Sequence, residues 1–155
     1  MATSTVPAAI DALLVILRTA PELSGVRVFD GPPTDDMAGP DFVAVGWQPE
    51  GEEAPAITQD FNAAGARTRD EEFDLLCWAE SWTGDRSVSA RRVRAFELLA
   101  VVEQAIRASG AQPEAPTLGG VVLWSHLTGA TLRQMFTQDG TRVGIAFTVS
   151  CRARI

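Results

Sequence analysis

The C-terminal stretch from Thr117 to Ile155 constrains the fold more than any other part of the chain. Beyond Gly144, two kinds of position alternate without a break. One set comprises Ile145, Phe147, Val149, Cys151 and Ala153, and the other comprises Ala146, Thr148, Ser150, Arg152 and Arg154. A period of two with one apolar face is typical of a half-buried antiparallel strand. Because Asp139-Gly140 supplies the positive φ angles of a two-residue type I′ turn, the sequence predicts a terminal β-hairpin.

Helical periodicity marks two segments. The first spans about Val6 to Ala20, and the second begins near Ser87 or Ser89 and reaches Ala108. In both segments, apolar residues recur at the three- and four-residue spacing of an amphipathic helix. These stripes are Ile10, Leu13, Leu14 and Leu17 in the first segment, and Ala95, Leu98, Leu99, Val102, Ala105 and Ile106 in the second.

Three further strands are predicted at residues 26–29, 42–48 and 72–82. Residues 57–69 are polar with a small-residue turn at Ala63-Ala64-Gly65, which predicts a long β-hairpin arm within about residues 49–70. The order is helix, two strands, arm, strand, helix, two strands. It predicts an α+β domain over residues 1–155, with a mainly antiparallel sheet of four to five strands packed against two helices.

The charge is distributed unevenly along the 155 residues. Residues 1–85 hold sixteen acids and four arginines, whereas residues 86–155 hold four acids and nine arginines. Such a chain is expected to attract copies of itself, and its net charge of −7 argues against general nucleic-acid binding. The longest apolar run, Ala12 to Leu17, is cut off by Arg18 and is far shorter than the roughly 20 residues that span a membrane. We therefore expect a protein made and kept in a cytoplasm, without a membrane partner.

The chain carries little that predicts catalysis. His126 is the only histidine, and its neighbour Ser125 would point to the opposite face of a strand, so the two cannot form a catalytic pair. No GxSxG, HExxH or Walker motif occurs. Cys77 and Cys151 are too few for a metal site and are interpreted as reduced core residues, with a disulfide between neighbouring strands as the alternative. We expect no enzyme activity, no cofactor and no metal.

The arginines that begin the second helix occupy an electrostatically unfavourable position for cations. Arg91, Arg92 and Arg94 therefore indicate either partner acids nearby or a solvated face. The loop carboxylates, which include Asp35 and Glu50, are interpreted as solvated charges because they lack a partner base or metal-ligand spacing.

Three segments carry a resemblance to a known family. They are Phe42-Val43-Ala44-Val45-Gly46, the run from Glu72 to Asp85 that leads into the arginine-rich second helix, and the ending from Gln138 to Ile155. Through these segments, nearly the whole chain resembles the tail terminators (tail-completion or minor tail proteins) of long-tailed bacteriophages. These small proteins cap the head-proximal end of the tail tube.

The resemblance implies a non-catalytic virion protein that forms a ring, usually a hexamer, between the last ring of tail tube protein and the head–tail connector or stopper. DNA would pass through the lumen without specific binding. The arm is the expected contact element, through Ile57, Gln59, Asp60, Phe61, Asn62, Arg67 and Arg69. A basic face would comprise Arg91, Arg92, Arg94, Arg152 and Arg154. The expected lumen or rim residues are Asp35, Asp36, Glu50, Glu52 and Glu53.

Two other functions remain open at this point. Another neck protein, a stopper or a head–tail adaptor, would favour a small β-barrel or a helix bundle. A small α+β hydrolase or ligand-binding protein would require a pocket with convergent polar groups.

Overall fold

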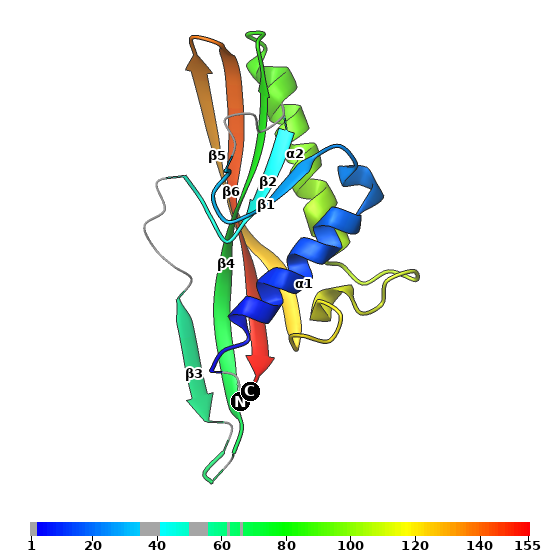
Figure 1. The fold of residues 1–155 in the computed structure, drawn as a ribbon, viewed down its shortest axis with the longest axis vertical. Helices are drawn as coiled ribbons and strands as arrows, with labels where there is room; N and C mark the ends of the chain where they lie inside the picture. Colours follow the sequence, from blue (N-terminus) through cyan, green and yellow to red (C-terminus); the bar gives the residue numbers. More distant parts are fainter. Residues whose placement is uncertain (1–2, 35–40, 50–55, 62, 66) are drawn as a thin grey trace.

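The computed structural model describes residues 3–34, 41–49, 56–61, 63–65 and 67–155 (Figure 1). Its elements are α1 (Val6–Thr19), η1 (Pro21–Leu23), β1 (Arg27–Asp30), β2 (Asp41–Val45), β3 (Ile57–Phe61), β4 (Arg69–Thr83), α2 (Val88–Ala105), η2 (Ala115–Thr117), β5 (Trp124–Thr137) and β6 (Gly140–Arg154). The α+β class is confirmed. The described strands number six, because the first half of the arm joins the sheet as β3.

One sheet in the order β1-β2-β4-β6-β5 forms the body of the molecule, and β3 pairs with the first part of β4 (Figure 1). Only β1 and β2 are parallel among these pairs; the others are antiparallel, as predicted. β4 and β6 pair along almost their whole length, from Asp70 opposite Arg154 to Thr83 opposite Thr141. This pair sets the long axis of the molecule.

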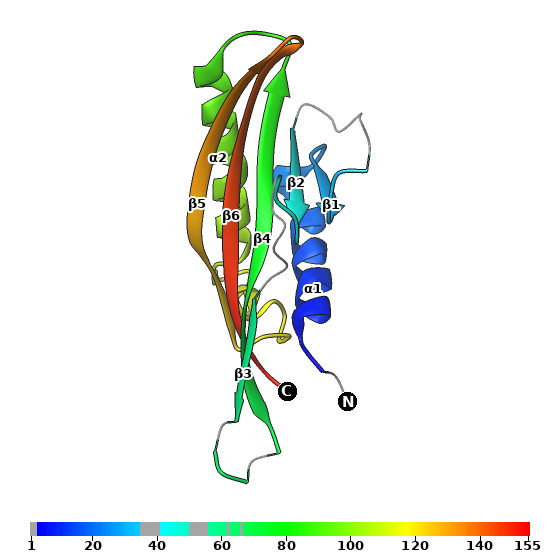
Figure 2. The same ribbon diagram turned by 90° about the vertical axis from the view of Figure 1, so that its left-hand side faces the viewer.

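The alternating residues of the last strand divide into a buried set and a partly exposed set, as predicted. The members of the buried set are at most 1% exposed and join one core cluster with residues of β4, α1 and α2. Both helices therefore pack on the same face of the sheet, called the helix face below; Figure 2 shows α2 lying behind β5 and β6.

The terminal hairpin is present, but the predicted turn type is wrong. Thr137 pairs with Gly140, so Gln138 and Asp139 form the loop. Leu118 is the only non-glycine residue with positive φ in the described part of the chain, so Asp139 does not adopt the type I′ conformation. The positive φ, 147°, falls on Gly140, where a Cβ would lie 2.7 Å from the Cα of Gly84. The close approach of this distant segment, which local sequence does not reveal, makes glycine necessary.

α2 ends at Ala105, three residues before the predicted end. Ile106 leaves the helical conformation while its side chain stays buried in the core. Beyond it, Ser109 and Gln112 exchange two backbone hydrogen bonds of 3.2 Å each. The Ser109 hydroxyl also accepts a bond of 3.0 Å from the Gln112 N–H. This local turn satisfies backbone groups that a further helical turn would otherwise use.

Candidate assembly surfaces

The arm predicted from residues 57–69 is a hairpin that extends the sheet at one end of the molecule (Figure 2). Ile57 pairs with Phe73 at its base, and Phe61 pairs with Arg69 near its tip. The side chain of Phe61 is 73% exposed and that of Ile57 is 47% exposed. Arg67 is also exposed. Asn62, another predicted contact residue, lies outside the described residues.

The base of the arm is fixed to the start of the chain through Glu71. This fully buried carboxylate accepts hydrogen bonds from the Thr5 N–H at 2.8 Å and from the Gln59 amide at 3.0 Å. The same Gln59 amide donates to the Thr3 carbonyl at 2.8 Å. Burial acts to raise the pKa of Glu71, but the hydrogen bonds from Ser4, Thr5 and Gln59 outweigh it and lower that pKa. Gln59, predicted as an interface residue, thus holds the arm in place within its own chain.

On the opposite face of the arm base, Asp70 binds the two C-terminal arginines. Arg154 Nε lies 2.8 Å from one Asp70 oxygen, and Arg152 lies 3.0 Å from the other. Hydrogen bonds from Arg154 and then Arg152 lower the pKa of Asp70. The cross-strand register explains the contact, because Asp70 is directly opposite Arg154 on β6.

The arginines at the start of α2 also have partners within the chain. Arg94 Nε lies 2.7 Å from Asp41 on β2, and Arg91 donates to the Ser81 hydroxyl at 2.8 Å. Ser81 in turn donates to Asp41 at 2.7 Å. The sequence left open whether these arginines face nearby acids or solvent, and Arg94 is paired with an acid. Arg92 is exposed.

The five arginines predicted as a basic face lie in two places. Arg91 bonds to Ser81, whereas Arg152 is opposite Glu72. Nine residues of β4 separate these two positions, about 30 Å at strand spacing. The structure therefore does not bring the predicted set together on one face.

The acidic and basic halves of the sequence are interleaved in the fold. Antiparallel pairing of β4 with β6 places acids of the first half beside arginines of the second, including Glu80 with Arg142 at 3.7 Å and Glu72 with Arg152 at 3.4 Å. Some of the complementary charge is thus paired inside one molecule, and the attraction between copies expected from the uneven charge stays a prediction.

β5 presents an exposed surface that sequence reasoning missed. Residues 128–136 of this edge strand are exposed on both faces, including Leu132, Met135 and Phe136. The Arg86 guanidinium lies 6.0 Å from the centre of the Phe136 ring. The available signal was the run from Leu132 to Phe136, which carries three large apolar residues without the regular alternation of a half-buried strand.

The face of β4 that carries Trp78, Glu80 and Trp82 is mostly a packed second layer on the side away from the helices. Trp78, Phe42 and Ala44 form a buried cluster there. The Trp78 indole N–H donates to Glu80 at 3.3 Å. Burial raises the pKa of Glu80, and Arg142 and this hydrogen bond only partly oppose the rise.

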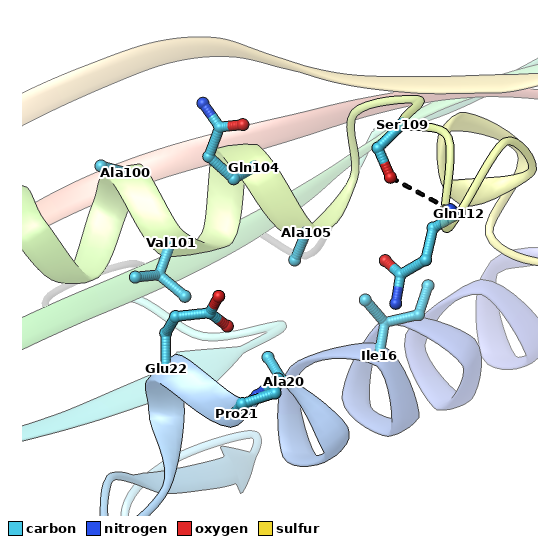
Figure 3. Close-up of a pocket in the computed structure, with 10 residues that line it drawn as sticks. All are labelled: Ile16, Ala20, Pro21, Glu22, Ala100, Val101, Gln104, Ala105, Ser109 and Gln112. Atoms are coloured by element: carbon cyan, nitrogen blue, oxygen red, sulfur yellow. Dashed lines mark hydrogen bonds between the residues drawn. The ribbon is translucent and has the colours of Figure 1, made fainter.

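A groove between α1, η1 and α2 is one candidate for ligand binding (Figure 3). It holds about 410 Å³, and its lining includes Ile16, Val101 and Gln104. Glu22 is the only ionisable side chain among its described lining residues, and Figure 3 shows it at the edge formed by η1. The lining therefore offers no nucleophile–base pair.

Ser125 and His126 border one hollow at the end of α2, but their side chains have different contacts. His126 is exposed and lies beside the Trp124 ring, whereas Ser125 is buried and donates to the Pro116 carbonyl at 2.9 Å. Cys77 and Cys151 are buried free thiols, and burial raises the pKa of each to about 12. Within the described residues, no cluster of potential ligands suits a metal ion. Neither described helix has the length and apolarity of a membrane-spanning segment.

The acids predicted to line a lumen lie outside the described residues. They are Asp35, Asp36, Glu50, Glu52 and Glu53.

Comparison with known proteins gives a result for the fold alone. No protein-family model and no curated protein matches the sequence. Among solved structures, a chain from the virion of a native gene transfer agent particle superposes with a TM-score of 0.64. The match covers 99% of this chain and 100% of that chain, at 15% sequence identity. The chain shares its fold with a virion component.

Proposed function

We propose that this protein is a non-catalytic structural subunit of a phage-like particle. More specifically, it forms a ring that caps the head-proximal end of the tail tube and joins the tube to the head–tail connector. The observation that carries the proposal is the end-to-end fold match with a chain of a gene transfer agent virion.

The exposed surfaces support an assembly role. The arm carries Phe61 and Ile57 away from the core, and β5 exposes Leu132, Met135 and Phe136 along a sheet edge. Large apolar side chains on an exposed edge favour contact with another protein, because natural sheets usually protect their edges. The α1–α2 groove, by comparison, has Glu22 as the only ionisable group in its described lining.

The architecture also favours the terminator over the other neck proteins. A stopper would be expected as a small β-barrel and an adaptor as a helix bundle. This chain instead has an open mixed sheet with two helices on one face. The proposed partners are therefore further copies of this chain, the tail tube protein and the connector or stopper, and the proposed location is the neck of the virion.

The ring model includes an acidic channel for DNA. A basic lining would retain phosphates through counterion release, whereas acidic groups allow the duplex to slide. The predicted lining acids, such as Asp35 and Glu50, belong to the acidic first half of the sequence. A ring whose channel is lined mainly by arginine would contradict this part of the proposal.

Loss of the gene in cells that produce the particle provides the functional test. Without its terminator, the tail tube should polymerise beyond its normal length, and heads should remain unjoined to tails. Electron microscopy of the lysate measures both, and wild-type protein supplied in trans should restore normal particles. Tails of normal length joined to heads in the deletion strain would refute the proposed function.

A variant at the arm tests the contact surface within the same assay. Phe61→Ser should fail to restore tail length, whereas Val15→Ser should restore it. Val15 is a matched control because it is an exposed apolar residue on α1, 61% exposed compared with 73% for Phe61. Equal restoration by both variants would show that the arm is dispensable for capping.

A further inference from the structure

Within the described sheet, the outer edges of β1, β3 and β5 are unpaired, and two of them, the edges of β3 and β5, resemble each other in sequence. β5 ends the strand order on one side, and β3 pairs only with β4 on the other side. A β-bulge at Leu127–Gly129 interrupts the first part of β5, but beyond it the strand pairs regularly with β6 through Thr137. The regular part contains no proline, and Arg133 is its only charged residue.

The two edges have matching patterns. β3 reads Ile57-Thr58-Gln59-Asp60-Phe61, and the exposed part of β5 includes Leu132-Arg133-Gln134-Met135-Phe136. In each, two large apolar residues flank a glutamine on one face of the sheet. That face is the helix face in both cases, because Ile57 is opposite the core residue Phe73 and Leu132 is opposite the core residue Ile145.

We propose that β3 of one copy pairs with β5 of a second copy, so that the sheet continues from subunit to subunit. In the antiparallel register with Gln59 opposite Gln134, Ile57 meets Phe136 and Phe61 meets Leu132 on the helix face. On the other face, the same register places Asp60 opposite Arg133. This single register therefore joins both apolar pairs and one pair of opposite charges.

The strand directions agree with this pairing. β5 and β4 run in the same direction, because each is antiparallel to β6, whereas β3 is antiparallel to β4. Two copies in the same orientation thus present opposed strand directions at the shared edge, with their helix faces on the same side. Because the contact joins two different edges, it is heterologous and passes from copy to copy, as a closed ring requires. This contact would be the subunit interface of the proposed ring, and it rests on the proposed function only in that such a ring forms.

Disulfide trapping tests the register. Thr58→Cys and Met135→Cys place two cysteines opposite each other, with Cβ atoms expected about 5 Å apart. Within one chain the two sites are separated by ten residues of β4, from Glu72 to Trp82, or roughly 33 Å, so any cross-link joins two molecules. The native cysteines are buried. Mild oxidation of the purified double variant, and of particles that carry it, should produce a ladder of covalent multimers on a non-reducing gel.

A displaced pair serves as the matched control. Thr58→Cys with Thr131→Cys moves one cysteine four residues along β5, about 13 Å, and should produce no ladder. An equal ladder from the control pair, or none from the first pair in particles that contain the protein, would overturn the inference. Covalent dimers from Met135→Cys alone would indicate that β5 pairs with itself about a two-fold axis, which would also overturn it. Because tail length and head joining are measured separately, the inference can fail while the proposed function stands.

Charge reversal provides a second test that does not use cysteine. Asp60→Arg should lower the share of multimers, measured by sedimentation, by up to roughly five-fold, and Arg133→Asp in the same chain should restore it. Asp60 lies opposite Asp70 within its own hairpin, so an arginine there meets an acid and is not expected to unfold the arm. Wild-type assembly by Asp60→Arg would contradict the register.

Discussion

Gly144 offers the sharpest test of the packing on the outer side of the sheet. This residue is on β6 directly opposite Glu80, next to Trp78 on β4. A Cβ built on Gly144 would overlap three atoms of the Trp78 indole, the farthest of them, Cε2, at 2.6 Å. Ordinary contact begins at about 3.4 Å, so Gly144→Ala must displace the ring by roughly an ångström or more.

The cost follows from the surroundings of that ring. Trp78 is 1% exposed and packs against Phe42 and Ala44, so it has little room to move. Overpacking of this kind costs about 1–3 kcal/mol. Displacement also breaks the hydrogen bond from Trp78 to Glu80, which contributes about 1 kcal/mol. We expect Gly144→Ala to lower the free energy of unfolding by about 2–4 kcal/mol, or Tm by roughly 5–15 °C for a chain of this length.

Urea and thermal unfolding, followed by tryptophan fluorescence and circular dichroism, measure the effect. Gly129→Ala is the control, because Gly129 is also on a strand but a Cβ there meets nothing within 4 Å. Its substitution should change the free energy of unfolding by less than about 1 kcal/mol. A Gly144→Ala variant as stable as the Gly129→Ala control would refute the packing account.

Three further predictions concern ionisable and thiol groups. Burial raises the pKa of Glu80 above its ordinary 4.5, so ionisation of Glu80 lowers the free energy of unfolding as pH rises above that value. Glu80→Gln should therefore have a higher Tm than wild type at pH 7 to 8. The same difference in Tm at pH 4 would contradict this prediction. Glu80→Gln also removes the ion pair with Arg142 at 3.7 Å. Because Arg142 is partly exposed, this loss should offset little of the gain in stability. The pKa of Asp70 is lowered from 3.8, so its contribution to stability is present above that pH and is lost as pH falls. Asp70→Asn should speed amide hydrogen exchange at the arm base at pH 7. Unchanged exchange would argue against an anchoring role for Asp70. Cys77 and Cys151, with pKa values of about 12, should resist a thiol reagent at pH 8 until the protein unfolds in urea, and rapid labelling of the native protein would show that these thiols are accessible.

Local pattern was sufficient for the elements whose residues alternate or recur regularly. The last strand and the α1 stripe were predictable because each buries one face against a continuous core. The arm was predictable as a hairpin because polar strands flank a small-residue turn. By contrast, the end of α2 depends on hydrogen bonds around Ser109, and the glycine at 140 is required by contact with Gly84, 56 positions earlier in the chain.

The surfaces were less predictable because long-range pairing determines them. Asp70 and Arg152 are separated by 82 positions, and only the β4–β6 register brings them together. For the same reason, acids and arginines that are far apart in the sequence lie side by side on the described strands β4 and β6. β5 is exposed because it lies at the edge of the sheet and because α2 packs mainly over β4 and β6. The order of the strands, which local sequence does not reveal, determines both.

A cryo-electron microscopy reconstruction of the head–tail junction, in particles from cells that encode this chain, tests the central claim most directly. The account predicts a closed ring of this chain, six copies of 16.6 kDa or about 100 kDa in all, between the last ring of tube protein and the connector. Location of the chain elsewhere in the particle, or its absence from particles with complete tails, would contradict the account.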